Sequence, residues 1–325
     1  MTLPRIGVTL GDPGGVGPEI VLKSFAGEVR LPPAEYVLFG SERVLRMEEE
    51  SVGIHYDFGP AGIRKRNPSG TLSFIDLPFS PRKLKKGMPT AGNGRTSFRY
   101  FQAAVDEARR GRLQAVVTAP ISKKSWALAG VRYRGHTEYL SRLYPGAIMA
   151  FWSDSLKVAL LSHHLSLRAA LRKVDKENLG RFFRGLDQSL KEMSPEGFEF
   201  LVAGLNPHAG EDGLLGREEI DEVEPAIKKA RRKGMRISGP YPPDVVFRKA
   251  LGQKNRVVIA LYHDQGLIPF KLEAFETGVN ITLGLPFVRT SPDHGTAFDI
   301  AGKNRANPES LVEAIRLAAA YSKTL

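Results

Sequence analysis

Three histidines of this 325-residue chain each follow a short apolar run. His164 comes after "VALLSH", His208 ends "VAGLNPH" and His263 ends "VIALYH". The runs are typical of β-strands, and ligands in open α/β sheets gather beyond the carboxyl ends of strands. Each histidine taken singly is more typical of an ordinary polar loop residue. Three imidazoles with an open position, however, form a catalytic arrangement for a divalent metal, and the pattern favours such a site.

Acidic residues near these histidines have two interpretations. Asp264 directly follows His263, and Asp244 lies in "GPYPPDVVF". Either carboxylate could orient an imidazole through a hydrogen bond, and either could simply stabilise a turn. The sequence leaves both interpretations open.

A set of cationic and amide side chains follows His263 along the chain. It consists of Lys271, Asn280 and Arg289, and Arg289 lies inside an apolar, glycine-rich segment. Such side chains suit the binding of a phosphate or a carboxylate. A fourth loop histidine, His136, lies in "YRGHTEY".

The opening stretch "TLGDPGGVGPEI" places four residues between a predicted strand and a predicted helix: Asp12, Gly14, Gly15 and Gly17. Backbone amides at the start of a helix can hold an anion, which makes these residues candidates for an anion-binding loop. The stretch matches neither the dinucleotide-binding fingerprint nor a P-loop. A purely structural turn explains it about as well.

The elements that must position these residues alternate between short β-rich runs and amphipathic helical patterns. The pattern predicts an α/β fold with a largely parallel sheet. Strands are predicted at 5–11, 36–40, 71–77, 115–120, 147–153, 156–162, 198–206 and 256–263. Helices are predicted at 41–50, 97–111, 176–193, 218–234 and 308–323. No repeat or long polar linker divides the chain, so two domains would be closely joined.

Composition excludes several classes of protein. With 42% hydrophobic and 25% charged residues the chain is typical of a soluble globular protein. No apolar run is long enough to span a membrane and no signal peptide precedes the first strand, so we expect a cytoplasmic protein. The absence of cysteine excludes thiolate ligands.

The net charge of +12 raises the possibility of an anionic partner. Within 216–234 the acidic residues come first and the basic residues last, which is the order that a helix dipole favours. Much of the excess of positive charge is therefore explained by basic side chains at helix ends. The basic runs 64–66 and 81–86 lack the interleaved aromatics of a single-strand-binding platform. We therefore predict a phosphorylated metabolite as the partner and no nucleic acid.

An ordered series of motifs spans nearly the whole chain and is far more specific than any one of them. The series resembles the 4-hydroxythreonine-4-phosphate dehydrogenase family of pyridoxal phosphate biosynthesis. Its members are "GDPGGVGPE", "TAPISK", "GHTEYL", "LNPHAGEDGLLGREE", "GPYPPDVVF", "YHDQG" and "VNITLGLPFVRTSPDHGTAFDIAG".

The resemblance implies a two-lobed fold like that of isocitrate and isopropylmalate dehydrogenases, with largely parallel sheets and an active-site cleft between the lobes. Residues 1–130 with 285–325 would form the first lobe and 131–284 the second. The second lobe would carry most of the metal and substrate ligands. The resemblance also implies a homodimer with its active site near the subunit interface.

The family's site residues fall on specific positions of this chain. The metal ligands would be His164, His208 and His263, and the substrate would be bound by His136, Thr137, Lys271, Asn280 and Arg289. His163 departs from the family's pattern, which has a small polar residue there, so a second imidazole neighbours the predicted ligand. In the opening motif, Gly14 and Val16 stand where alanine and isoleucine are common.

The implied reaction is an oxidation that uses NAD or NADP and one divalent metal, either zinc, cobalt or magnesium. The substrate would be 4-phosphooxy-L-threonine, and its 3-keto product would lose carbon dioxide to give 3-amino-2-oxopropyl phosphate. Asp244 or a water relay would accept the hydroxyl proton. Two alternatives remain: a related dehydrogenase for 4-phosphothreonate, 4-phosphoerythronate or a cis-diol carboxylate, and, more distantly, a basic nucleic-acid-binding protein.

Overall fold

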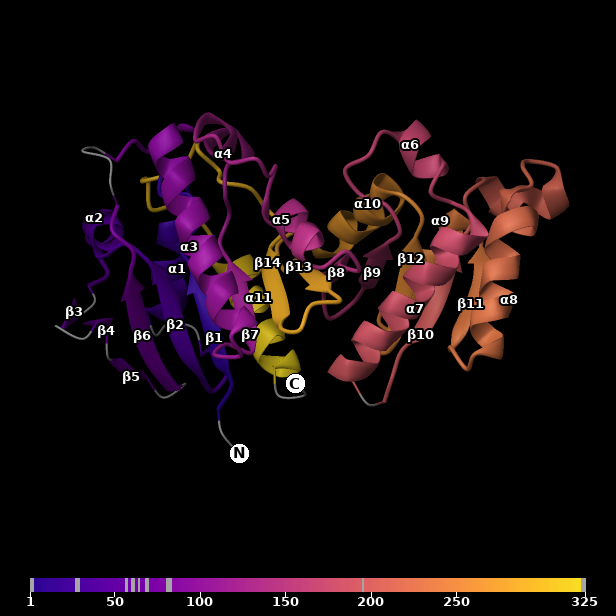
Figure 1. Ribbon diagram of the computed structural model, residues 1–325, viewed down its shortest axis with the longest axis horizontal. Coiled ribbons are helices and arrows are strands. Elements are labelled where there is room, and N and C mark those ends of the chain that lie inside the picture. The colour runs from indigo at the N-terminus through magenta and orange to yellow at the C-terminus, as the bar shows by residue number, and fades with distance from the viewer. Residues whose placement is uncertain are drawn as a thin grey trace. The chain divides into compact units, whose positions relative to one another are not determined.

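The chain divides into two compact units (Figure 1). The computed structural model describes residues 3–26, 30–55, 58–59, 62–63, 65–67, 70–79, 84–194 and 196–322. The first unit consists of Met1–Pro145 and Pro286–Lys323, and the second of Gly146–Leu285. The first boundary therefore lies after residue 145, where the sequence-based division placed it after residue 130.

Helix α5, at His136–Leu143, explains the shift of that boundary. Its Tyr139 ring packs edge-on against two rings of helix α3, at Ala91–Arg109, with centroid distances of 5.8 Å to Phe98 and 5.2 Å to Phe101. Aromatic packing of this kind buries a large apolar area. His136 and Thr137 consequently belong to the first unit, where the sequence-based division placed them in the second.

The sheet of the first unit is parallel except at one edge. Its strands follow the order β14-β7-β1-β2-β6-β5, and only the pairing of β5 with β6 is antiparallel. Their bounds are β1 Arg5–Thr9, β2 Ala34–Gly40, β5 Lys65–Asn67, β6 Gly70–Asp76, β7 Ala115–Thr118 and β14 Val288–Pro292. Strands β7 and β14 are buried throughout, as in parallel sheets covered on both faces. The short strands β3 Phe58–Gly59 and β4 Gly62–Ile63 form a separate antiparallel pair.

The helices of the first unit flank this sheet in Figure 1. Besides α3 and α5 they are α1 Gly17–Phe25, α2 Glu42–Val52, α4 Lys123–Leu128 and α11 Glu309–Tyr321. Two of them begin at hydroxyl caps: Thr90 accepts from the amide of Asn93 before α3, and Ser122 from that of Ser125 before α4. Such caps satisfy amides that the first turn leaves without an acceptor.

The sheet of the second unit is mixed. Strands β11, β10, β12 and β9 are parallel in this order, and β8 and β13 continue the sheet with antiparallel pairings. Their bounds are β8 Ile148–Trp152, β9 Lys157–Leu160, β10 Glu199–Ala203, β11 Ile237–Tyr241, β12 Arg256–Ala260 and β13 Val279–Leu283. The parallel strands thus end at one common edge.

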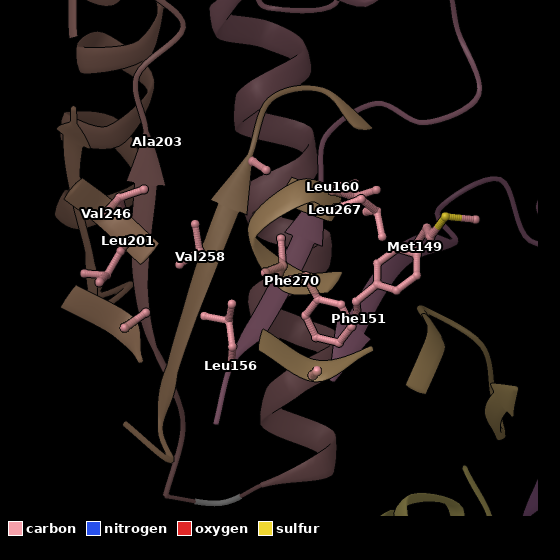
Figure 2. Packing of buried hydrophobic residues seen from close by; sticks show 14 residues of the cluster. Met149, Phe151, Leu156, Leu160, Leu201, Ala203, Val246, Val258, Leu267 and Phe270 are labelled. Atoms are coloured by element: carbon pink, nitrogen blue, oxygen red, sulfur yellow. The ribbon is translucent and has the colours of Figure 1, made fainter. Parts of the chain in front are cut away.

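Side chains of two helices, α9 (Pro243–Ala250) and α10 (His263–Ala274), pack with those of the strands in a hydrophobic core (Figure 2). The other helices of this unit are α6 Leu167–Leu171, α7 Lys176–Met193, η1 Pro207–Gly213, η2 Glu219–Val223 and α8 Glu224–Arg232. The ring of Phe270, on α10, is fully buried and lies 5.6 Å from that of Phe151 on β8. Burial of such a ring contributes about 2 kcal/mol or more, so it anchors α10 and the histidine at its start.

The predicted α/β fold with largely parallel strands is confirmed. One predicted helix, 218–234, is interrupted: a π-helical turn at Glu219–Val223 precedes α8. Pro225 lies at the start of α8, where the missing amide of proline breaks a continuous α-helical ladder. Among the helices of the described residues, none combines the length and apolarity that crossing a bilayer requires.

Candidate functional site

Three neighbouring parallel strands of the second unit, β10, β12 and β9, carry the predicted metal ligands beyond their carboxyl ends. His164 lies in the loop after β9, His208 lies in η1 after β10, and His263 is the first residue of α10 after β12. Since the strands are parallel and adjacent, all three loops leave the same edge of the sheet, as the sequence predicts.

Two of the three predicted ligands meet in one pocket of about 230 Å³. The ring centroids of His164 and His263 are 5.7 Å apart, and that of His163 lies 5.3 Å from His164. His208 does not line this pocket. Within the described part of the chain, no group of three or more His, Cys, Asp or Glu side chains is placed to hold a metal ion. The structure therefore brings together two predicted ligands and the extra imidazole of His163.

Carboxylates orient two of the imidazoles. Asp264 Oδ1 lies 2.7 Å from His263 Nδ1, and Glu211 Oε1 lies 3.3 Å from His208 Nδ1. When Nδ1 donates to a carboxylate, the lone pair remains on Nε2, which is how metal-binding histidines are commonly prepared. Of the two interpretations of Asp264, the contact favours the orienting one, and the donor chemistry fits a metal.

Two polar side chains that the sequence analysis missed join the ends of the three strands. Ser162 Oγ donates to the carbonyl of Leu261 at 2.9 Å. Gln265 accepts from the amide of Leu261 at 2.7 Å and donates to the carbonyl of Gly204 at 2.6 Å. Both side chains are buried, so these bonds hold the histidine-bearing loops in register. Gln265 lies in "YHDQG", but only the fold reveals its partners.

The loop of His208 has an unusual backbone. From His208 to Asp212 every φ is positive, between 46° and 85°. Left-handed conformations cost roughly 1–2 kcal/mol for each residue with a side chain, so other contacts must hold them. The buried carboxylate of Glu219 accepts from the amides of Leu205 at 2.7 Å and Asn206 at 2.8 Å, just before this turn. Strain held in this way is typical of functional loops.

The first unit contains a separate polar cluster around Arg289. This side chain is 2% exposed, and its Nη2 lies 2.7 Å from Thr118 Oγ1 and 3.1 Å from His136 Nδ1. Strand β14 supplies Arg289, the end of β7 supplies Thr118, and the start of α5 supplies His136. Thr118 was not predicted, because nothing in "AVVTAP" distinguishes it from other strand-end threonines.

The contact with Arg289 determines the tautomer of His136. A guanidinium only donates hydrogen bonds, so Nδ1 accepts and the proton resides on Nε2. His136 Nε2 is buried and makes no hydrogen bond to any residue that the structure describes. Burial and, secondarily, the charge of Arg289 hold the pKa of His136 well below its usual value. The result is a neutral imidazole that offers one buried donor.

Arg289 supplies the positive charge of this cluster. Burial lowers the pKa of its guanidinium to about 9, which still leaves it charged at neutral pH. A buried charge next to an unused N–H donor is a typical anion-binding arrangement.

The neutral imidazole of His136 makes stability depend on pH. Because the folded-state pKa lies below the unfolded value of about 6.5, the unfolded chain binds more protons as the pH falls below that value. We expect the free energy of unfolding to fall there by up to about 1.4 kcal/mol per pH unit. Urea denaturation at several pH values measures this slope. His136→Gln should reduce it and the exposed control His55→Gln should not; equal slopes would contradict the assignment.

The remaining predicted site residues lie elsewhere. In the second unit, Lys271 is half-buried on α10 with its Nζ 5.9 Å from the Phe275 ring centroid, and Asn280 is half-buried on β13. Asp244 is exposed in the first turn of α9, where the helix dipole stabilises a negatively charged carboxylate. Thr137, in the first unit, is half-buried in the first turn of α5.

The opening glycine loop uses its amides internally. The amide of Gly14 donates to Asp12 Oδ1 at 2.8 Å, and that of Gly15 to the carbonyl of Asp12 at 3.0 Å. A Cβ on Gly14 would lie 2.8 Å from the carbonyl oxygen of Lys85, and one on Gly17 2.3 Å from that of Leu10. Close backbone packing therefore explains these glycines, and the contacts favour the structural turn over an anion site.

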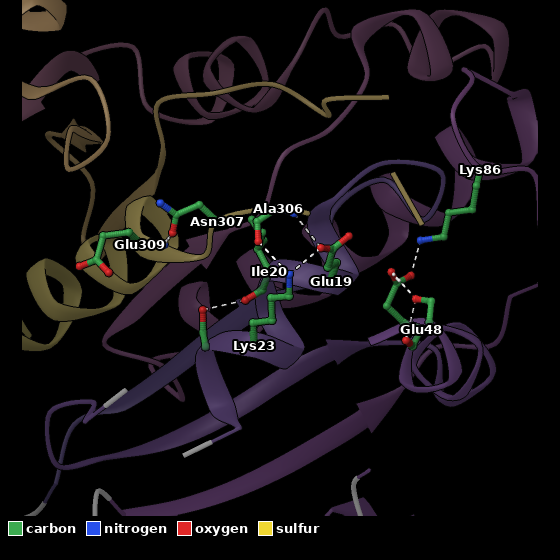
Figure 3. A network of polar contacts seen from close by, with 10 residues as sticks. Glu19, Ile20, Lys23, Glu48, Lys86, Ala306, Asn307 and Glu309 are labelled. Atoms are coloured by element: carbon green, nitrogen blue, oxygen red, sulfur yellow. Dashed lines mark hydrogen bonds and ion pairs between the residues drawn. The ribbon is translucent and has the colours of Figure 1, made fainter. Parts of the chain in front are cut away.

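Two buried glutamates near this loop bind lysine side chains (Figure 3). Glu19 Oε1 accepts from Lys23 Nζ and from the amide of Ala306, both at 2.8 Å. Lys86 pairs with the buried Glu48. Lys86 is the last residue of the basic run 81–86, so at least this residue of the run has a structural role. Residues 81–83 and the side chains of 64–66 lie outside the described residues.

Known proteins similar to this chain identify its family. Residues 33–318 match the family described as "PdxA: Pyridoxal phosphate biosynthetic protein PdxA". A 4-hydroxythreonine-4-phosphate dehydrogenase of Desulforapulum autotrophicum is 39% identical, with 97% of this chain and 95% of the relative covered. A D-threonate 4-phosphate dehydrogenase of Salmonella typhimurium is 41% identical, with 98% and 99% covered.

A solved structure is also similar. The crystal structure of 4-hydroxythreonine-4-phosphate dehydrogenase from Klebsiella pneumoniae has a TM-score of 0.87 and 39% identity, covering 98% of each chain. The match extends over both units. The chain therefore belongs to the PdxA family of pyridoxal phosphate biosynthetic proteins.

Proposed function

We propose that this chain is a nicotinamide-dependent dehydrogenase that oxidises 4-phosphooxy-L-threonine in pyridoxal phosphate biosynthesis. The observation that carries the proposal is the cluster of Arg289 and His136, in which a buried guanidinium lies beside an unused N–H donor. The family match and the names of relatives support the reaction class.

In this proposal Arg289 and the Nε2–H of His136 bind the substrate's phosphate, and Thr118 orients the guanidinium. Thr137, in the first turn of the same helix as His136, would add its hydroxyl, and Lys271 and Asn280 are proposed as further substrate contacts. Fixing a remote phosphate orients the reacting carbon, which is how binding energy is used for catalysis.

The oxidation removes a proton from the C3 hydroxyl and a hydride from C3, and an oxidised nicotinamide, from NAD or NADP, supplies the hydride acceptor. The product is a 3-keto acid, which loses carbon dioxide to give 3-amino-2-oxopropyl phosphate. Asp244 or a water relay is proposed as the proton acceptor. Asp244 is exposed to solvent, so water can reach it whether the carboxylate itself or a water relay accepts the proton.

His164 and His263, with His208 as the third ligand, would hold a divalent metal. Such a metal lowers the pKa of a bound hydroxyl and stabilises negative charge on oxygen. Imidazole ligands suit zinc or cobalt better than magnesium, which prefers oxygen. Asp264 and Glu211 orient two of the imidazoles, and Gln265 and Ser162 hold the loops from which the ligands project.

A second candidate substrate is D-threonate 4-phosphate. Relatives with this name are as similar to the chain as those named for 4-hydroxythreonine 4-phosphate, at 41% and 39% identity. The two substrates share the phosphate and differ in the group on C2.

A substrate panel tests both candidates. Phosphorylated 4-hydroxythreonine, threonate and erythronate, with a cis-diol carboxylate, are compared by the absorbance of reduced nicotinamide with NAD and with NADP. We expect the highest kcat/KM for phosphorylated 4-hydroxythreonine. A higher kcat/KM for the threonate would establish the second candidate, and no oxidation of any phosphorylated compound would refute the proposed function.

We also propose that the chain forms a homodimer through α10. Ile268, Leu272 and Phe275 recur at helical spacing and are 61%, 84% and 76% exposed. An apolar stripe of this kind on a helix is typical of an interface. The first residue of the same helix is His263, so a partner seated on α10 would lie near the proposed metal ligands.

Replacing the stripe should separate the subunits. The double variant Leu272→Lys, Phe275→Lys is expected to convert a dimer into a monomer, because burying two ammonium groups in an apolar interface is strongly unfavourable. Light scattering after size exclusion measures the mass. Leu128→Lys, an exposed leucine on α4, serves as the control, and a double variant that stays dimeric would rule out this interface.

A further inference from the structure

A second recess lies in the first unit, on the exposed side of helix α3. Its volume is about 560 Å³, within the range of roughly 300–1,000 Å³ that is usual for small-molecule sites. Helix α3 and the segment between α4 and α5 supply its walls. Six side chains define its chemistry: Arg95, Arg99, Arg132, Phe98, Tyr133 and Tyr139.

Three guanidinium groups give the recess a positive charge. Arg95 and Arg99 lie one helical turn apart on α3, a spacing at which like charges repel. None of the three arginines forms an ion pair with a carboxylate among the described residues, and no acidic side chain lines the recess. A bound anion would remove this repulsion.

Three aromatic side chains line the recess beside these charges. Phe98 and Tyr133 are stacked, with ring centroids 6.2 Å apart and planes at 27°. Tyr139 meets both edge-on, at 5.8 Å and 4.9 Å. The guanidinium of Arg132 lies 4.9 Å from the Tyr133 ring centroid and donates to Tyr133 Oη at 2.7 Å. An aromatic ring of a ligand can pack against these side chains while the arginines bind a phosphate.

We propose that this recess binds a planar aromatic ring that carries a phosphate group. Adenosine phosphates and pyridine phosphates both have this chemistry. The recess is distinct from the Arg289 cluster, because Arg289 and Thr118 do not line it. The two are linked through Tyr139 and His136, whose rings both pack against Phe101, at 5.2 Å and 4.4 Å.

Isothermal titration of the full chain tests the proposal with AMP and pyridoxine 5′-phosphate as probes. Adenosine, pyridoxine and inorganic phosphate are the matched controls that lack either the phosphate or the ring. We expect at least one probe to bind, and at least about ten-fold weaker binding for its dephosphorylated form and for inorganic phosphate, since charge-assisted hydrogen bonds and stacking both contribute. The probe that binds identifies the source of the ligand.

Variants then locate the binding. Arg95→Gln and Arg132→Gln should each weaken the probe about ten-fold, whereas Arg142→Gln, an exposed arginine on α5 outside the recess, should leave it unchanged. Saturating NAD or NADP should not displace the probe. The proposal is overturned if neither probe binds, if both recess variants bind normally, if inorganic phosphate binds as tightly, or if a dinucleotide displaces the probe.

Discussion

Replacing Arg289 by glutamine is expected to lower kcat/KM for the phosphorylated substrate about 10³-fold. The guanidinium is buried between Thr118 and His136, so its removal takes away the charge that binds the phosphate and leaves both neighbours without their partner. Truncating one member of a buried charged contact costs about 2–5 kcal/mol, and 4 kcal/mol corresponds to roughly 10³ in rate. Steady-state kinetics measures the loss, which should appear in KM as well as in kcat.

Two further variants separate this effect from a folding defect. Arg289→Lys keeps a positive charge but not the planar guanidinium, whose Nη2 contacts both Thr118 and His136, so an intermediate loss is expected. Arg316→Gln, on the surface of α11, should keep normal kinetics. A folded Arg289→Gln protein with unchanged kcat/KM would contradict the assignment of the phosphate site.

Replacing His263 by alanine is expected to abolish most of the bound metal and to lower kcat about 10³-fold, because catalytic metal sites use about three protein ligands and seldom tolerate the loss of one. Among the proposed ligands, His263 has the most contacts that fix its position: it begins α10, its Nδ1 lies 2.7 Å from Asp264 Oδ1, and its ring centroid lies 5.7 Å from that of His164. Metal content by atomic emission spectroscopy, together with kcat, measures both effects.

The same measurement tests the other histidines. His208→Ala should lose metal to a similar extent if His208 completes the ligand set. If His163→Ala loses metal while His208→Ala retains it, the third ligand is His163, which already lies in the pocket. His55→Ala is the control, since His55 is exposed and distant in sequence from all the predicted ligands. Full metal content and full activity in His263→Ala would exclude the proposed site.

Much of the site's position could be predicted from the sequence. Apolar runs identify the strands, and a polar residue at the end of each run identifies the loop at its carboxyl end. This local pattern placed His164, His208 and His263 correctly beyond β9, β10 and β12. It failed where local signals are ambiguous: the glycines after β1 suit an anion loop and a tight turn equally, and only their packing partners favour the turn.

The sequence by itself therefore determined the α/β class and the family, because strand and helix periodicity and motif order are local or sequential properties. Only the tertiary structure decided which side chains meet. The contact between Arg289 and His136 joins residues 153 positions apart. The left-handed turn at His208 and the bonds of Gln265 and Glu219 depend on partners from other elements. Such contacts arise from strand order and packing, which no local pattern encodes.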